Sequence, residues 1–459
     1  MKKNNSFSFI DLFAGIGGFH HALTPLGGKC VLACESDPAC KTVYQRSFEH
    51  REEYRFVDNI RLITRAEIDD PNALKPRARI LREGLVPDHD LLCAGFPCQP
   101  FSKSGSQRGT MDDTRGTLFH DIMQIVDAKR PPYLFLENVR NLAGPRHKET
   151  WETIVRVIQS SGYHVDPEPL IFSPHLLPKS RGGRPQVRDR VYILAIHKSI
   201  RDAEKRLLAI RRLNQTLAKR RGHEADQWTI KDYLDPDDQI ENLSEYYLSS
   251  EDERYLSAWN DLVENIPTDA LPGFPIWAFA FKTRPNLDND DPAWKKDFLT
   301  KNHAFYTEHK VFLDEWMARH QVLEFPHSRQ KFEWQARKQH PKKRSESGVG
   351  RTINDLVCQM RPSGIRVKPA TYLPALVAIT QTSVVGPSAR HTTGRSRRFR
   401  KLTPIEAGVL QGIPRNVYKI NRKTGKAVVS DKEAYKQLGN AVNVHLVREV
   451  ARYLLGLKG

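Results

Sequence analysis

The chain has 459 residues, with 72 lysines and arginines against 54 aspartates and glutamates, so its formal net charge is +18. Hydrophobic residues make up 39% and aromatic residues 9% of the chain, which is enough for packed cores, excludes a disordered polyelectrolyte and favours two or three domains. No apolar run reaches the roughly 18 residues of a membrane span, and no clean signal-peptide core follows the basic N-terminus. These features favour a cytoplasmic protein with an anionic partner such as nucleic acid, which would place it at the nucleoid.

The cysteines give no sign of a disulfide scaffold or a metal site. Six cysteines in a chain of this length are too few for a disulfide framework and fit a reducing compartment. Cys30, Cys34 and Cys40 lie close together in the sequence, but their spacing is not that of a usual zinc site and no matching fourth ligand follows. We interpret them as small buried side chains and expect no metal ion.

Short apolar strands alternate with amphipathic helices over the first 200 residues, a pattern typical of a parallel sheet covered by helices on both faces. The expected strands are Ser6–Leu12, Lys29–Ala33, Asp90–Ala94, Tyr133–Leu136 and Arg190–Ile196. The alternation stops after the last of them, so we expect a domain boundary near residue 197. Because ligands bind beyond the carboxyl ends of such strands, the residues that follow them should converge on one crevice.

A glycine turn, Phe13 to Gly18, follows the first strand and opens a helix. Its backbone can approach a ligand closely. Glu35 follows Gly18 by 17 residues, at the exit of the second strand, where a carboxylate can accept hydrogen bonds from ribose hydroxyls. The glycines are spaced more closely than in the dinucleotide-binding pattern, so a nucleoside-containing ligand is favoured over a nicotinamide cofactor. The alternative is a tight turn that serves only helix–strand packing.

Cys98 lies between two prolines just beyond the third expected strand. The prolines restrict the backbone, so the thiol is expected on a rigid, exposed turn, as a nucleophile requires. Such a thiol needs positive potential or a proton acceptor nearby, and Arg188 and Arg190 are candidates for that potential. Glu137 follows the next strand, where it can hold or donate a proton. The alternative for Cys98 is an inert core cysteine.

Seven segments in this order resemble the motifs of the C5-cytosine DNA methyltransferases. They are Asp11–Gly18, Gly95–Ser102, Arg115–Phe119, Glu137–Val139, Pro185–Arg190, Leu402–Pro414 and Tyr435–Val442. The resemblance covers residues 6–197 and 400–457. It implies an α/β fold: a Rossmann-like S-adenosylmethionine-dependent methyltransferase domain with a second, smaller target-recognition domain. The expected domains are a catalytic domain at 1–197, a recognition domain at 198–433 with a helical insertion at 198–320, and a returning segment at 434–459.

The resemblance implies a covalent mechanism on a cytosine that is flipped out of the duplex, which costs a few kcal/mol. Cys98 would add to C6 while Glu137 engages N3 and the exocyclic amine, and C5 would then take the methyl group of S-adenosyl-L-methionine, leaving S-adenosyl-L-homocysteine. Arg190 and Arg188 would contact the pyrimidine O2 and a nearby phosphate.

The same comparison implies further binding residues. Glu35 would bind the cofactor ribose, Asp58 or Asn59 with Ile60 the adenine, and Asn440 with Val442 would close the methionine end. The full cofactor set is Phe13, Gly15, Gly17, Gly18, Glu35, Ser36, Asp58, Asn59, Ile60, Pro97, Leu118, Asn440 and Val442. The DNA-binding candidates are Ser102, Ser104 and Gln107 on a closing loop, with Arg395, Arg397 and Arg398 in the recognition region.

Charge is distributed unevenly in the long segment between the two matching regions. Residues 231–270 contain 12 acidic and 2 basic residues, and residues 328–401 contain 17 basic and 3 acidic residues. We expect the basic segment to read DNA and the acidic stretch to face solvent away from it. Residues 201–221 form a basic amphipathic pattern, interpreted as an ordinary solvated helix.

The sequence therefore predicts a DNA (cytosine-5-)-methyltransferase of a restriction-modification or phage-defence system, acting as a monomer on double-stranded DNA beside a cognate restriction endonuclease or other defence protein. The first alternative is an RNA (tRNA) cytosine-5 methyltransferase, against which the long basic segment counts. The second is a non-catalytic DNA-binding regulator, against which the intact Cys98, Glu137, Arg188 and Arg190 count.

Overall fold

The computed structural model describes residues 6–48, 53–65, 76–97, 117–220, 229–267, 270–286, 290–336, 352–376, 383–392, 398–418 and 427–457. The chain divides into two compact units, one of Met1–Glu224 with Ala407–Gly459 and one of Ala225–Glu406. These boundaries differ from the expected ones near residues 197 and 433, for reasons that lie in the packing of the first unit.

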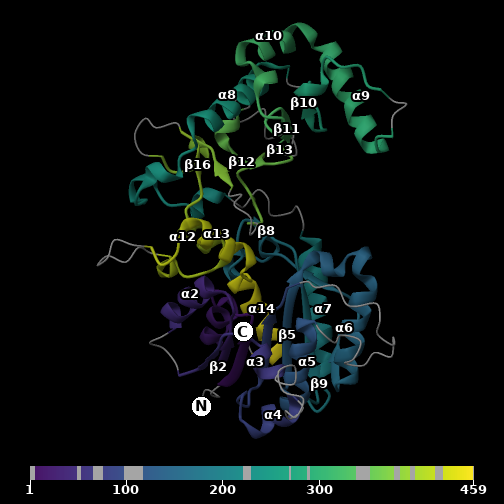
Figure 1. Ribbon diagram of the computed structural model, residues 1–459, viewed down its shortest axis with the longest axis vertical. Helices are drawn as coiled ribbons and strands as arrows, with labels where there is room; N and C mark the ends of the chain where they lie inside the picture. Colours follow the sequence, from purple (N-terminus) through teal and green to yellow (C-terminus); the bar gives the residue numbers. More distant parts are fainter. Residues whose placement is uncertain are drawn as a thin grey trace. The chain divides into compact units, whose positions relative to one another are not determined.

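The first unit is built on an eight-stranded sheet with the strand order β3-β2-β1-β4-β5-β9-β6, in which β7 also pairs with β9 (Figure 1). The strands are β1 (Phe7–Leu12), β2 (Gly28–Cys34), β3 (Arg55–Val57), β4 (Leu91–Gly95), β5 (Tyr133–Val139), β6 (Tyr163–Val165), β7 (Leu170–Phe172) and β9 (Arg190–His197); β8 (Gln186–Val187) precedes β9. The first five are parallel, as predicted. β9 is antiparallel because it enters between β5 and β6 from the opposite end of the sheet.

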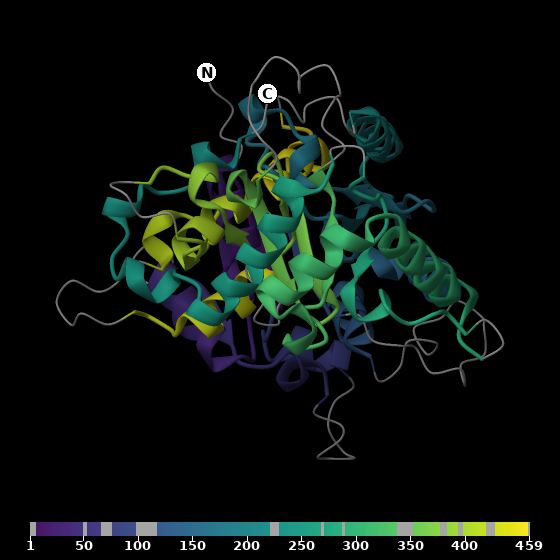
Figure 2. The same cartoon turned by 90° about the horizontal axis from the view of Figure 1, so that it is seen from above.

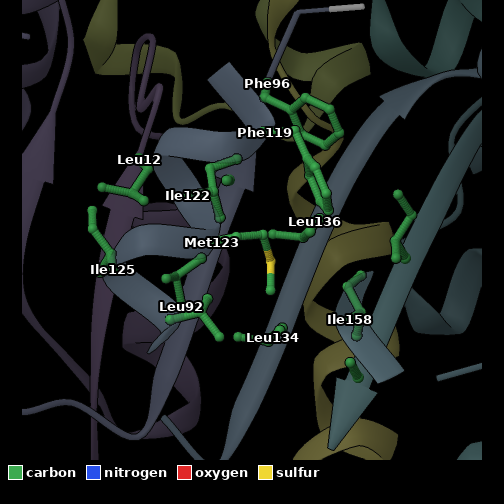
Figure 3. Packing of buried hydrophobic residues seen from close by; sticks show 14 of the residues in the cluster. Leu12, Leu92, Phe96, Phe119, Ile122, Met123, Ile125, Leu134, Leu136 and Ile158 are labelled. Atoms are coloured by element: carbon green, nitrogen blue, oxygen red, sulfur yellow. The ribbon is translucent and has the colours of Figure 1, made fainter. Parts of the chain in front are cut away.

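Helices cover both faces of this sheet because neighbouring strand residues point to opposite sides. Figure 3 shows Ile122 and Met123 of α5 (Leu118–Lys129) packed over the strands beside Leu134 and Leu136 of β5. Phe135 lies between those two leucines and points to the other face, where its ring centroid is 5.2 Å from that of Phe19. The remaining helices of this unit are α1 (Gly18–Leu23), α2 (Pro38–Phe48), α3 (Arg61–Thr64), α4 (Pro76–Arg82), α6 (Lys148–Ser160), α7 (Ala203–Lys219), α13 (Asp431–Asn440) and α14 (Val444–Leu455), and α12 (Pro404–Gln411) spans the unit boundary.

The basic helix α7 belongs to the first unit, which moves the boundary beyond residue 197. Leu207, Ile210 and Leu217 are buried, and Arg211 forms an ion pair of 2.6 Å with Asp166. The interpretation as an ordinary solvated helix therefore holds for only one of its faces. The returning chain joins this unit at residue 407 rather than 434, since Leu410 is fully buried and its carbonyl accepts a hydrogen bond from Asn443.

The second unit contains a mixed sheet of order β10-β11-β13-β12-β15-β16. Its strands are β10 (Ile276–Trp277), β11 (Lys331–Trp334), β12 (Leu356–Arg361), β13 (Gly364–Pro369), β15 (Val384–Val385) and β16 (Arg400–Lys401), with β14 (Leu373–Pro374) in addition. Its helices are α8 (Ser250–Asn265), α9 (Ala293–Glu308) and α10 (Lys310–His320). Figure 2 shows the helices and strands of this part in teal and green.

Helices α8 and α10 share one hydrophobic core with this sheet, so the expected helical insertion is not a separate body. Trp259 of α8 stacks on Phe332 of β11 with ring centroids 4.7 Å apart, and Trp316 of α10 lies 5.0 Å from Trp259. All three rings are at most 1% exposed. Helices in residues 250–320 therefore complete this unit by covering the apolar face of its sheet.

The acidic stretch does not simply face solvent, contrary to the expectation from its charge. Asp237 is 3% exposed and accepts hydrogen bonds from Arg390 Nε at 3.1 Å and Arg400 Nε at 3.0 Å. Glu253 likewise lies 3.2 Å from Arg398. Because a buried charge without a partner is costly, part of the acidic segment neutralises part of the basic one inside this unit. Not all of the basic surplus is therefore available to an anionic ligand.

No helix in the described part of the chain combines the length and apolar character needed to cross a membrane.

Candidate functional site

A cavity of about 630 Å³ opens in the first unit where β1, β2, β4 and β5 end. Of the strand-exit residues expected to converge, Gly15, Gly18, Glu35 and Glu137 do so. Among the predicted site residues, Phe13, Gly15, Gly18, Glu35, Ser36, Asn59, Ile60, Pro97, Leu118, Glu137, Arg190, Asn440 and Val442 line it. Cys98 lies outside the described residues, and Pro97, immediately before it in the chain, is in the lining.

The glycine turn is held open by left-handed backbone. Phe13 has φ 57° and Gly15 has φ 55°, and a phenylalanine in this region is strained by roughly 1–2 kcal/mol. Strain of this kind concentrates at functional sites. Glu35 fastens the turn, since its Oε2 accepts from the Gly15 amide and its Oε1 from the Asp37 amide, each at 2.8 Å. A carboxylate has about four acceptor positions, so Glu35 can still accept from a ligand hydroxyl.

The C-terminal segment closes the same cavity. A Cβ on Gly18 would lie 2.5 Å from Val442 Cγ2, so only glycine lets this segment approach the turn. Lys436 of α13 lies 3.0 Å from Asp37, beside Glu35. These contacts explain why residues more than 400 positions apart in the sequence line one cavity.

Gly17 and Asp58 are not in the lining of this cavity as the structure describes it. A Cβ on Gly17 would lie 2.4 Å from the Phe48 ring, so this glycine is required by its φ of 84° and by packing. The Asp58 side chain is exposed and pairs with Lys41. Of the two adenine alternatives from the sequence, Asn59 is therefore the residue that borders the cavity.

Glu137 and Arg190 lie side by side on neighbouring strands. Glu137 is paired in register with Tyr192, which places Arg190 at the diagonal position. Arg190 Nε lies 3.1 Å from Glu137 Oε1. Burial raises the pKa of Glu137, and the positive charges of Arg190 and Arg188 counteract this only in part. A carboxyl group in this setting is suited to keep a proton and to deliver it.

Arg188 occupies a different setting from the one expected for a base contact. It is 1% exposed, and its Nη2 donates to the carbonyls of Gly439 and Ala441, both at 2.8 Å. Burial and the neighbouring charge of Arg190 lower the pKa of Arg188 to about 9. Its contacts fix the backbone on both sides of Asn440 and thereby shape the wall of the cavity.

Asn138 is a positioning residue that the sequence interpretation left without a role of its own. Its Nδ2 donates to the Phe96 carbonyl at 2.9 Å, and its Oδ1 accepts from the Val139 amide at 2.8 Å. The buried amide thus joins the ends of β4 and β5 directly before Pro97. A polar residue after a strand-exit glutamate was the available signal.

Most of the predicted DNA-contacting residues, Ser102, Ser104, Gln107, Arg395 and Arg397, lie outside the described residues. Arg398 is described and is engaged within its own unit. It pairs with Glu253, donates to the Leu248 carbonyl at 2.8 Å and lies 4.6 Å above the Tyr247 ring. These contacts hold the chain before β16.

Within the described ranges, no group of three or more histidine, cysteine, aspartate or glutamate side chains is placed to hold a metal ion. Cys30 and Cys34 are buried, and burial raises the pKa of the Cys34 thiol to about 12. The Cys34 thiol therefore does not have the character of a reactive thiolate.

Comparison with known proteins identifies relatives that match this chain over about half of its length or over nearly all of it. The type II methyltransferase M.AluI from Cellulosimicrobium cellulans is 35% identical over an alignment that covers 98% of this chain and 92% of the relative. M.HhaI from Haemophilus parahaemolyticus is 34% identical over 53% of this chain and 61% of its own length, and M.HpaII from Haemophilus parainfluenzae is 40% identical over 42% and 47%. The match to M.AluI therefore includes the long central segment.

The family model described as C-5 cytosine-specific DNA methylase matches residues 7–456. This range contains both the cavity and the strand exits that build it. The chain therefore belongs to the C-5 cytosine-specific DNA methylase family and is a DNA (cytosine-5-)-methyltransferase.

Proposed function

We propose that the protein transfers a methyl group from S-adenosyl-L-methionine to C5 of a cytosine that is flipped out of a specific duplex DNA sequence, and that it acts in a restriction-modification system. The observation that carries this proposal is that the glycine turn, Glu35, Glu137 and Arg190 line the same cavity. One wall suits a nucleoside-containing cofactor and the other a polar heterocycle. The restriction-modification role rests on the similarity to type II methyltransferases.

The residues of the first wall fit S-adenosylmethionine. Glu35 keeps acceptor positions for ribose hydroxyls, and Ile60 and Phe13 offer apolar surface to an adenine. Among the described residues, apart from its chain neighbours, no atom lies within 4 Å of where a Cβ on Gly15 would stand. Asn440 and Val442 border the same space. When bound, S-adenosylmethionine supplies an electrophilic methyl group, and no metal ion is required.

Glu137 and Arg190 of the second wall act together with Cys98, which lies outside the described residues, to activate the pyrimidine. The Cys98 thiolate forms a bond to C6, and the electron pair displaced from the C5–C6 bond makes C5 nucleophilic. Glu137 holds the proton at N3 that keeps the ring from accumulating negative charge. Arg190 orients Glu137 and offers a donor to the pyrimidine O2. After methylation, loss of the C5 proton returns an electron pair to the ring and expels the Cys98 sulfur.

A covalent adduct is the sharpest test of this mechanism. With a duplex in which 5-fluorocytosine replaces the target cytosine, C5 carries no proton to lose, so the wild-type protein should remain attached to the DNA in the presence of S-adenosylmethionine. Cys98→Ala should form no adduct and transfer no methyl group, while still binding the cofactor. Methyl transfer by Cys98→Ala at the wild-type rate would refute the covalent mechanism.

A competition between substrates addresses the two alternatives. Equimolar duplex DNA and tRNA are offered with labelled cofactor, and bisulfite sequencing of a plasmid from expressing cells reports which cytosines are modified and in which sequence. We expect 5-methylcytosine in one short duplex sequence. Preferential labelling of tRNA would favour an RNA methyltransferase, and absence of labelling in both would favour a regulator. Sedimentation of the complex tests the expected monomer on DNA. Coexpression with a cognate restriction endonuclease tests whether the methylation protects DNA from cleavage.

A further inference from the structure

The first unit carries a second cavity of about 1050 Å³, bordered by α7, α14 and the segment 179–184. It shares no lining residue with the cavity described above. Seven lysines and arginines line it against only two carboxylates, Asp202 and Glu449. We call this cavity the basic groove.

Both carboxylates of the basic groove already have arginine partners. Arg206 Nε lies 2.8 Å from Asp202, and Arg181 Nη1 lies 2.9 Å from Glu449. The lining therefore keeps a surplus of five lysine and arginine side chains over carboxylates. A surplus of this density in a concave surface favours a bound anion.

The inner wall of the basic groove contains desolvated cations beside one another. Arg184 Nη2 donates to His445 Nε2 at 2.8 Å, which requires a neutral imidazole. Burial and the charges of Arg184 and Arg448 lower the pKa of His445 to about 4. Arg448 Nε is buried and has no hydrogen-bond partner among the described residues. The guanidinium of Arg448 is thus only partly paired within the protein, through its Nη2, which donates to the His21 carbonyl at 3.5 Å.

Stabilisation of a helix end does not account for this arrangement. Cations favour the C-terminal end of a helix, and Arg206, which donates to the Leu454 carbonyl at the end of α14, fits that role. His445 is neutral and Arg448 lies in the second turn of α14, so the helix dipole explains the placement of neither.

We infer that the basic groove binds phosphates of the DNA backbone outside the base pairs that hold the target cytosine. This inference rests on the proposed function, because it takes duplex DNA as the substrate. A run of phosphodiesters can match several cations at once, whereas a single small phosphate would engage one or two. Guanidinium groups present paired donors to phosphate oxygens, and the exposed Lys179 and Lys205 extend the groove to solvent.

Duplex length separates this contact from contacts at the target. Binding is measured at several salt concentrations for duplexes of about 12 and about 40 base pairs. Both duplexes carry the same unmethylated target sequence. The variant Lys179→Gln/Lys205→Gln should bind the long duplex roughly five- to tenfold more weakly, with a salt slope smaller by about 2. It should bind and methylate the short duplex like the wild type. The control Arg212→Gln/Lys219→Gln removes two exposed charges of α7 that are not in the lining.

Equal loss on both duplexes, no loss on the long duplex, or the same loss in the control would overturn the inference. A second measurement uses acetylation of lysines in the full-length protein, read by mass spectrometry. Lys179 and Lys205 should be protected by the long duplex and not by the short one, while Lys219 stays reactive with both. If the wild type methylates no cytosine in either duplex, the proposed function fails; normal methylation without any effect of length refutes the groove alone.

Discussion

The buried ion network of the second unit gives a sharp test of how its opposite charges are organised. Asp237 accepts hydrogen bonds from Arg390 and Arg400, and Arg400 also donates to Glu406 at 2.8 and 2.9 Å. All four residues are at most 3% exposed. The change Asp237→Asn keeps the shape of the side chain but leaves two buried guanidiniums with one carboxylate.

Removing one partner from a buried ion pair costs about 3–5 kcal/mol. With a urea m-value of about 2 kcal/mol/M, a loss of about 4 kcal/mol lowers the unfolding midpoint by about 2 M. Tryptophan fluorescence suits the assay because Trp259, Trp277, Trp294, Trp316 and Trp334 all belong to the second unit. The transition of this unit should therefore dominate the signal.

The neighbouring Asp238→Asn is the matched control, because it removes the same charge from an exposed position. Its midpoint should shift by less than about 0.3 M, since surface substitutions usually change stability by less than about 0.5 kcal/mol. Equal shifts for Asp237→Asn and Asp238→Asn would show that only net charge matters and would refute the network argument.

Three further predictions concern the first unit. Gly18→Ala should weaken S-adenosylmethionine binding about tenfold or more, because the new methyl group overlaps Val442 and overpacking costs about 1–3 kcal/mol. Titration calorimetry measures the affinity. If the overlap is the cause, Gly18→Ala/Val442→Ala should recover most of it. Arg188→Gln should raise the Kd for the cofactor, since Arg188 binds the Gly439 and Ala441 carbonyls. The adduct with 5-fluorocytosine DNA should remain detectable at saturating cofactor. An unchanged Kd would contradict this positioning role. Burial lowers the pKa of His89 to about 4. Between pH 6.5 and 4 the unfolded chain therefore binds a proton that the folded unit excludes. The free energy of unfolding should fall by up to about 3 kcal/mol as the pH drops through that window. His89→Gln should flatten the pH dependence of the thermal midpoint, and His147→Gln, which removes a half-buried imidazole, should not. Parallel curves for wild type and His89→Gln would argue against the assignment.

The sequence was sufficient to predict the central strands of the first sheet and half of the residues around its cavity. The glycine turn, Glu35 and Glu137 follow strands whose apolar runs are evident, and strand exits in a parallel sheet must meet at one edge. The order of the motifs added the family. The antiparallel direction of β9 and the exact lining escaped this reasoning, because Gly17 and Asp58 directly adjoin residues that line the cavity and only packing turns them away from it.

Charge was the property that the sequence described least completely. Summed along the chain, residues 231–270 and 328–401 appear as separate acidic and basic surfaces. In the folded unit, Asp237 lies between Arg390 and Arg400, more than 150 positions away. A count of charges determines the sign of the partner a protein attracts, and the sequence by itself determined that sign and the chemistry of the strand exits. Only the tertiary structure decided which charges remain for the partner, because burial forces an ion to find its counterion wherever the fold brings one within reach.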